Sequence, residues 1–140
     1  MKQSNLHDEV ANVNEDIKRV LDAGIYGAPE LKPAEKALFL STFRERVYVA
    51  LTKRQVAQNN VYQEVINEMK RIRNGILYLN GDLSYSMLSK YIKEASKASL
   101  SFTIVNDKET DTPLGLVLAS KQDAIEREEI FVHDDRFSLD

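Results

Sequence analysis

The chain has 140 residues, of which 43% are hydrophobic and 29% are charged, with a formal net charge of −3, and these values predict one globular domain over residues 1–140. No apolar run approaches the roughly 20 residues that cross a bilayer, and the N-terminus lacks the apolar segment of a signal peptide. The chain also has no cysteine, which excludes disulfides and thiolate chemistry, so we expect a soluble cytoplasmic protein with no membrane partner.

The first forty residues predict a helical arm. Residues 1–7 are expected to be a loose end. An apolar stripe with helical spacing then runs through Val10, Val13, Ile17, Val20 and Leu21. Gly24 is expected to end this helix, and Pro33 suits the first turn of a second, short helix that continues to residues 38–40.

Apolar runs further along the chain predict four strands, at residues 47–51, 76–79, 102–105 and 114–119. A helix is expected between the first two strands, from an N-cap at Asn60 to about Arg73, and another between the next two, capped by Ser84. The pattern from Ile125 to Ile130 weakly predicts one more helix. Residues 133–140 are expected to be an acidic, loose end.

The order of these elements predicts the fold class. One helix separates each of the first three strands from the next, so the right-handed crossover rule makes strands one to three parallel in one sheet. Only eight residues join strands three and four, too few for a crossover, so strand four is expected to be antiparallel. We therefore predict an α/β three-layer sandwich with a mixed four-stranded sheet, helices on both faces and an N-terminal helical arm.

Several short motifs are distributed over the chain after about residue 20. They are Tyr26-Gly27-Ala28-Pro29-Glu30, Thr42-Phe43-Arg44-Glu45-Arg46-Val47, Leu79-Asn80-Gly81, Phe102-Thr103-Ile104-Val105-Asn106-Asp107 and Leu114-Gly115-Leu116-Val117-Leu118-Ala119. Together they resemble the YueI-like family, bacterial proteins of unknown function.

The resemblance implies a three-layer α/β sandwich, similar to the fold of trimeric bacterial chorismate mutase and of the ribosomal proteins that bind kink-turn RNA. It implies no chemistry, because such folds host unrelated functions. No chorismate mutase catalytic residue can be matched to this chain. The family pattern also leads us to expect a glycine directly before the Thr42–Val47 motif, where this chain has Ser41.

Polar residues follow the carboxyl ends of the three predicted parallel strands, where open α/β sheets bind ligands. They are Thr52, Lys53, Arg54 and Gln55 after strand one, Asn80 and Asp82 after strand two, and Asn106 and Asp107 after strand three, with Thr112 before strand four. This set of cations, carboxylates and amides suits a small polar or anionic molecule. The competing interpretation, which we favour, is ordinary turn chemistry and helix capping.

Arg44, Glu45 and Arg46 stand at the start of the first predicted strand. The two arginines can form a fork for a phosphate or a carboxylate. Alternatively, they tie the helical arm to the sheet through ion pairs with Glu30 or Glu35, and we favour this structural role.

Three functions remain open. We favour a non-catalytic module, either small-ligand-binding or regulatory, with its polar site at the carboxyl edge of the sheet. The alternatives are a structured-RNA-binding protein that uses the basic segment 53–73, and an enzyme of unknown reaction with Asp82 or Asp107 as general acid or base.

We predict no catalytic residue, cofactor or metal. The two histidines, His7 and His133, lie in predicted tails, and no phosphate-loop or nucleophile motif is present. A homo-oligomer is expected, because a small sheet must cover its exposed edge.

Overall fold

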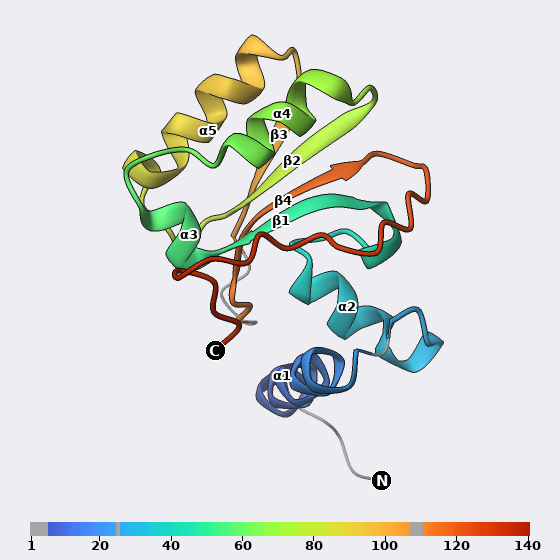
Figure 1. The fold of residues 1–140 in the computed structure, drawn as a ribbon. Coiled ribbons are helices and arrows are strands. Elements are labelled where there is room, and N and C mark those ends of the chain that lie inside the picture. The colour runs from blue at the N-terminus through green and yellow to red at the C-terminus, as the bar shows by residue number, and fades with distance from the viewer. Residues whose placement is uncertain (1–5, 25, 107–110) are drawn as a thin grey trace, which may run out of the picture.

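A four-stranded sheet lies between two layers of helices in the computed structural model, which describes residues 6–24, 26–106 and 111–140 (Figure 1). The strands are β1 (Val47–Thr52), β2 (Gly75–Asn80), β3 (Ser101–Val105) and β4 (Leu114–Ser120). The α-helices are α1 (Leu6–Ala23), α2 (Lys32–Leu38), α3 (Lys53–Ala57), α4 (Gln63–Arg71) and α5 (Tyr85–Lys97). Two 3₁₀ turns are η1 (Pro29–Leu31) and η2 (Arg44–Arg46).

The strands lie in the order β1-β4-β2-β3. β4 pairs antiparallel with β1 on one side and with β2 on the other, whereas β2 and β3 are parallel neighbours. The mixed four-stranded sheet is therefore confirmed, but its detail is corrected, because among the described strands β1 pairs only with the antiparallel β4. β4 takes the place between β1 and β2, where all seven of its residues are buried. Since β1 and β2 are both antiparallel to β4, the carboxyl ends of β1, β2 and β3 still point to one end of the sheet.

α3, α4 and α5 cover one face of the sheet (Figure 1). The period of two along each strand selects the residues that face these helices. From the strands they are Val49, Leu51, Leu77, Leu79, Leu116 and Leu118. α3 can approach β4 closely because residue 115 is glycine: a Cβ there would lie 2.9 Å from the Val56 side chain and 3.1 Å from the Lys53 Cα.

α1 and α2 cover the opposite face, as the predicted helical arm requires (Figure 1). The apolar stripe of α1 meets this core through Ile17 and Val20, and α2 contributes Ala34 and Leu38. The intervening strand residues from β1 and β4 face the same core. No helix in the described part of the chain is long and apolar enough to cross a membrane.

The turn after α2 places two consecutive residues at positive φ, Leu40 at +54° and Ser41 at +90°. The Ser41 N–H donates to the Lys36 carbonyl at 2.8 Å and so closes the C-terminal end of the helix. The conformation of this turn favours glycine. Ser41 stands at the position where the family pattern leads us to expect that residue.

α4 begins later than the sequence predicts, at Gln63, and Asn60 is not its N-cap. The residue before the helix is Tyr62, which is 7% exposed and whose N–H donates to the Tyr91 hydroxyl at 3.0 Å. Burial of this tyrosine holds the chain extended before the helix starts.

The segment after β4 forms no helix at residues 125–130, so that prediction is wrong. The Ile125 and Glu126 N–H groups donate to the Glu45 carbonyl instead, and the Ala50 N–H donates to the Ile130 carbonyl at 2.8 Å. This segment follows the outer edge of β1, where it makes an isolated bridge between Ala50 and Phe131. Hydrogen bonds to β1 and η2 thus replace those of the predicted helix.

Candidate functional site

The carboxyl end of β1 runs directly into α3 through a capping box. The Thr52 hydroxyl accepts from the Gln55 N–H at 3.4 Å, and the Gln55 side chain accepts from the Thr52 N–H at 2.9 Å. Both residues are buried, at 1% and 0% exposure. These two predicted ligand contacts therefore serve the helix start.

Gln55 also attaches the C-terminal segment. Its side-chain amide donates to the Val132 carbonyl at 2.6 Å and to Asp134 Oδ1 at 3.0 Å, while the Tyr62 hydroxyl donates to Asp134 Oδ2. The Thr52 hydroxyl also donates to the Arg136 carbonyl at 3.4 Å. Residues 133–140, expected as a loose end, are instead held to the domain, because a buried amide and a tyrosine share the Asp134 carboxylate.

These contacts shift the pKa of both ionisable partners. The hydrogen bond from Tyr62, followed by that from Gln55, holds the pKa of Asp134 below its usual range despite some desolvation. Burial, followed by the hydrogen bond to Asp134, raises the pKa of the Tyr62 hydroxyl. The pair is therefore a neutral tyrosine and a charged carboxylate at neutral pH.

Asn80 is a third predicted contact with a structural role. It is 4% exposed, its amide donates to the Leu114 carbonyl at 2.9 Å, and its side-chain oxygen accepts from the Asp82 N–H at 2.9 Å. The exposed Asn106 packs its side chain against Gly81 so closely that a Cβ at residue 81 would overlap it. Asp107 lies outside the described residues.

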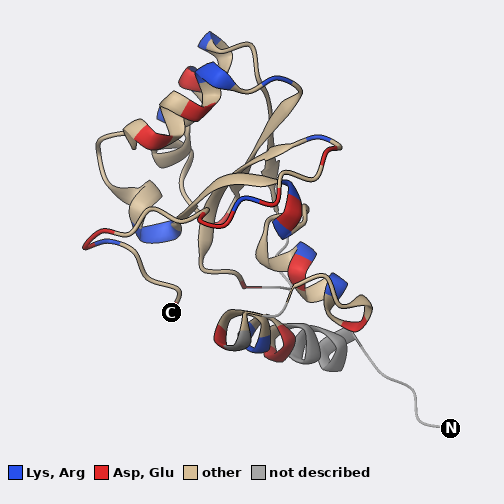
Figure 2. Cartoon of the chain, turned by 45° about the vertical axis from the view of Figure 1, so that its right-hand side comes forward, with Lys and Arg blue, Asp and Glu red and all other residues tan. Residues whose placement is uncertain are grey.

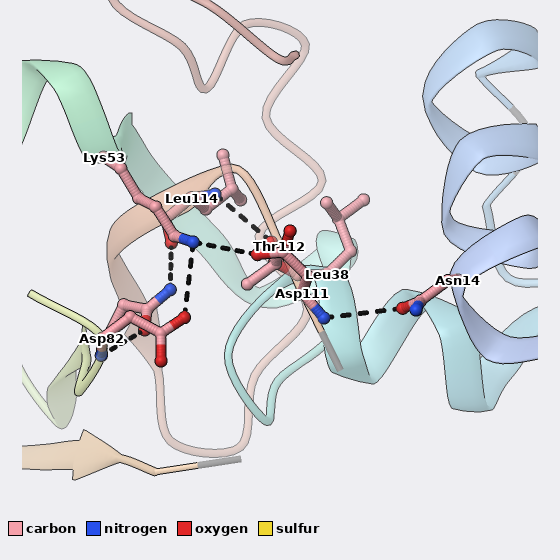
Figure 3. A network of polar contacts seen from close by, with 8 residues as sticks. Asn14, Leu38, Lys53, Asp82, Asp111, Thr112 and Leu114 are labelled. Atoms are coloured by element: carbon pink, nitrogen blue, oxygen red, sulfur yellow. Dashed lines mark hydrogen bonds and ion pairs between the residues drawn. The ribbon is translucent and has the colours of Figure 1, made fainter. Parts of the chain in front are cut away.

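Lys53 joins the ends of the strands (Figure 3). Its ammonium group lies 2.9 Å from Asp111 Oδ1 and 3.4 Å from Asp82 Oδ2. Partial burial lowers the pKa of Lys53, but the hydrogen bonds and charges of the two carboxylates outweigh it, so the pKa is raised overall. The lysine is thus a fixed cation whose charge is already balanced.

Thr112 completes this network (Figure 3). Its buried hydroxyl donates to the Leu38 carbonyl at 2.7 Å and accepts from the Leu114 N–H at 3.2 Å. The Asp111 N–H donates to the Asn14 side chain at 3.5 Å. The start of β4 is thereby connected to α1 and α2.

A cavity of about 400 Å³ lies beside this network, between α1, the start of α3, the start of β4 and the C-terminal segment. Apolar side chains line part of it: Ile17, Leu21, Pro113 and Leu139. Charged side chains of both signs line the rest: Lys18, Lys53, Arg54, Asp22, Asp111 and Asp140. Of the predicted site residues that the structure describes, only Lys53, Arg54 and Thr112 reach the cavity. Thr52, Gln55, Asn80, Asp82 and Asn106 do not line it.

The sequence reasoning missed the contribution of α1. Asn14, Lys18 and Asp22 all line the cavity and are spaced by four residues, which places them on one side of a helix. That spacing was visible in the sequence. What it could not show is that this polar side of α1 lies beside the carboxyl end of β1.

Arg44, Glu45 and Arg46 form the 3₁₀ turn η2 rather than the start of the first strand. The Arg44 N–H donates to Glu35 Oε2 at 3.0 Å, and its guanidinium donates to the carbonyls of Arg127 and Glu128. The Arg46 guanidinium donates to the Lys121 carbonyl at 3.4 Å. In the described part of the chain these arginines bond main-chain carbonyls, and neither makes an ion pair with Glu30 or Glu35.

Arg44 and Glu45 line a second cavity of about 510 Å³. Its arginines are already engaged: Arg44 binds two carbonyls, and Arg127 donates to the Tyr48 carbonyl at 3.0 Å and pairs with Glu68 at 2.8 Å. This cavity therefore offers fewer available cations than the one beside α1.

The basic segment 53–73 is divided between two ends of the sheet. Lys53 and Arg54 start α3 at the carboxyl end of β1, whereas Lys70, Arg71 and Arg73 precede the amino end of β2. β1 and β2 point the same way, so these two groups lie at opposite ends. Figure 2 shows basic residues distributed over separate elements. Among the described residues, no cluster of three or more His, Cys, Asp or Glu side chains could hold a metal ion.

Fold and site together define an α/β sandwich domain with a mixed sheet and a charged cavity beside it. The chain belongs to the family described as "Protein of unknown function (DUF1694)", whose model matches residues 14–131. This confirms the predicted membership of the YueI-like family.

Two comparisons support the assignment. Over 118 residues the chain is 44% identical to "Uncharacterized protein YueI" of Bacillus subtilis (strain 168), an alignment that spans 84% of this chain and 89% of that protein. The crystal structure of the YueI protein from Bacillus subtilis matches with a TM-score of 0.76 at 43% identity, covering 86% of this chain and 94% of that one.

Proposed function

We propose that this domain is a non-catalytic module that binds a small polar ligand with an anionic group in the cavity beside α1. The observation that carries the proposal is the pair Lys18 and Arg54, which come from different elements and line the same cavity. Neither forms an ion pair with any residue that the structure describes. Two such cations at one concave site suit a carboxylate or a phosphate.

The rest of the lining supports the same ligand class. Lys53 contributes little additional attraction, because Asp82 and Asp111 already balance its charge. The apolar wall suits a short hydrocarbon part, and Asp22 and Asp140 suit an ammonium or hydroxyl group elsewhere on the ligand. A ligand that carries groups of both kinds, such as an amino acid, fits this distribution of charge.

A thermal-shift screen tests the proposal with small carboxylates, phosphates and amino acids at millimolar concentration. A ligand present at about 100 times its Kd stabilises the folded state by about 2.7 kcal/mol, which is readily measured as a rise in Tm. Arg54→Gln and Lys18→Gln should each reduce that rise. Arg73→Gln is the matched control. Arg73 is an exposed arginine like Arg54, but it lies before the amino end of β2, at the end of the sheet opposite the cavity.

The three substituted residues are exposed, so each variant should retain its stability within about 0.5 kcal/mol in the absence of ligand. The proposal fails if no compound raises Tm. It also fails if the rise in Tm persists unchanged in both Lys18→Gln and Arg54→Gln.

A further inference from the structure

The two edges of the sheet differ in whether another segment of the chain covers them. This difference is unrelated to the proposed ligand site. At the β1 edge, the chain's own residues 125–131 supply hydrogen-bond partners, including the bond from the Ala50 N–H to the Ile130 carbonyl and that from the Arg127 guanidinium to the Tyr48 carbonyl. At the β3 edge, no segment within the described ranges pairs with the outer side of the strand.

β3 carries none of the features that usually prevent an edge strand from pairing. Its sequence, Ser-Phe-Thr-Ile-Val, has no charge and no proline, and its five residues pair with β2 in a regular register without a bulge. Ser101, Phe102 and Thr103 are exposed, and 42% of the Phe102 surface is accessible to solvent. An uncharged, regular edge with an exposed aromatic ring is suited to pairing with another strand.

We propose that β3 of a second copy of this chain pairs antiparallel with this edge, with Thr103 on the two-fold axis. The sequence of β3 is complementary to itself in this register. Centring on Thr103 pairs all five residues, whereas any other centre leaves some of them without a partner. Phe102 then lies opposite Ile104 of the second copy, and Thr103 lies opposite its own equivalent. Both are favoured cross-strand pairs.

The orientation of β3 side chains agrees with this pairing. Phe102 aligns with Leu77 of β2, and Ile104 aligns with Leu79, so all four lie on the face covered by α5. The Phe102 ring, half exposed in one copy, would therefore extend the apolar layer under α5 into the second copy. The result is one continuous eight-stranded sheet.

The size of the contact sets the expected strength. Five residues from each copy bury less than the roughly 800 Å² per partner of a standard stable interface. We therefore expect a reversible dimer with Kd on the order of 10 micromolar. Such a dimer dissociates on dilution.

Sedimentation velocity over about a hundredfold range of concentration around 10 µM should show the shift from monomer to dimer. Phe102→Lys, which places a charge on the edge, should move that shift to at least tenfold higher concentration. Tyr85→Lys is the matched control, because Tyr85 is a more exposed aromatic residue, at 65%, at the start of α5. It should leave the dimer unchanged.

Cysteine cross-linking tests the register, and the chain has no cysteine of its own. Residues directly opposite in an antiparallel pair have Cα atoms about 4.5–5.5 Å apart, within the range of a disulfide, so Thr103→Cys should form a covalent dimer on mild oxidation. Ser101→Cys should not, because the two copies of residue 101 would be about 13 Å apart. Tyr85→Cys reports random collisions.

Selective cross-linking of Thr103→Cys supports the proposal. A wild-type protein that stays monomeric throughout the concentration range overturns it. So does a dimer in which Ser101→Cys or Tyr85→Cys cross-links as well as Thr103→Cys, because the contact then lies elsewhere or in another register.

Discussion

Replacing Ser41 by glycine should stabilise the protein, because the backbone at Ser41 has a φ of +90°, which residues with a Cβ rarely adopt. A left-handed conformation costs an L-residue about 1–2 kcal/mol. Glycine gives back about 0.5–1 kcal/mol through the larger entropy of its unfolded chain. Ser41 is exposed, so no burial is lost. The net expectation is a gain of about 0.5–1 kcal/mol in the free energy of unfolding and a rise in Tm of roughly 2–5 °C.

Leu40 provides the contrast, since it shares the positive φ but is only 3% exposed. Leu40→Gly relieves comparable strain and at the same time removes a buried side chain. Burial of a leucine contributes about 1.5–3 kcal/mol, and the cavity left behind adds to the loss. We therefore expect Leu40→Gly to destabilise the protein by about 2–4 kcal/mol.

Urea unfolding followed by circular dichroism measures both effects. Ser41→Gly should raise the midpoint without changing the m-value. Ser41→Ala is the control, because it keeps the Cβ and with it the strain, and it should stay within about 0.5 kcal/mol of the wild type. If Ser41→Gly unfolds at the same urea concentration as Ser41→Ala, or at a lower one, strain at this position is not the cause and the reasoning is refuted.

Because hydrogen bonds lower the pKa of Asp134 in the folded state, its contribution to stability is complete above the unfolded pKa of about 3.9 and is lost as the pH falls through the lower, folded value. Asp134→Asn should therefore flatten the acid limb of the stability curve measured by urea unfolding, and an unchanged limb would contradict this. Gly81→Ala should destabilise the protein by about 0.5–1 kcal/mol, because the new Cβ overlaps the Asn106 side chain, which is exposed and can turn away at a small cost. Asn106→Ala in the same chain should recover part of the loss in a double-mutant cycle, whereas strict additivity would argue against the overlap. Arg44→Lys should cost about 1–2 kcal/mol, since the shorter lysine side chain ends before the terminal guanidinium nitrogen that donates to both carbonyls. Arg46→Lys, which replaces a single 3.4 Å bond, should cost less than about 0.5 kcal/mol. Equal losses in thermal or urea unfolding would contradict the distinction.

The elements that the sequence predicts correctly are those with a strong local pattern. The continuous apolar runs at β1, β2 and β4 and the helical stripe of α5 leave little choice of structure. The order of the strands has no such local signal. β4 follows β3 in the chain, yet it lies between β1 and β2, because its seven buried residues need helices on both faces and strands on both sides. The absence of a helix at 125–130 also has a non-local cause, because main-chain groups of β1 and η2 take the hydrogen bonds that a helix would make within itself.

A polar residue at the end of a strand can face solvent, or it can be buried and hydrogen-bonded to main-chain groups. Composition alone does not distinguish these two arrangements. Gln55 and Asn80 each satisfy main-chain groups of other segments and are buried, whereas Arg54, next to Gln55 in the chain, is exposed in the cavity wall. A side chain that satisfies distant main-chain groups cannot be released to a ligand without leaving those groups unpaired, which costs about 1–3 kcal/mol each. The long cations are therefore the side chains that we propose for binding. Lys18 of α1 lines the same cavity as Arg54 because the helical arm folds back against the carboxyl end of β1.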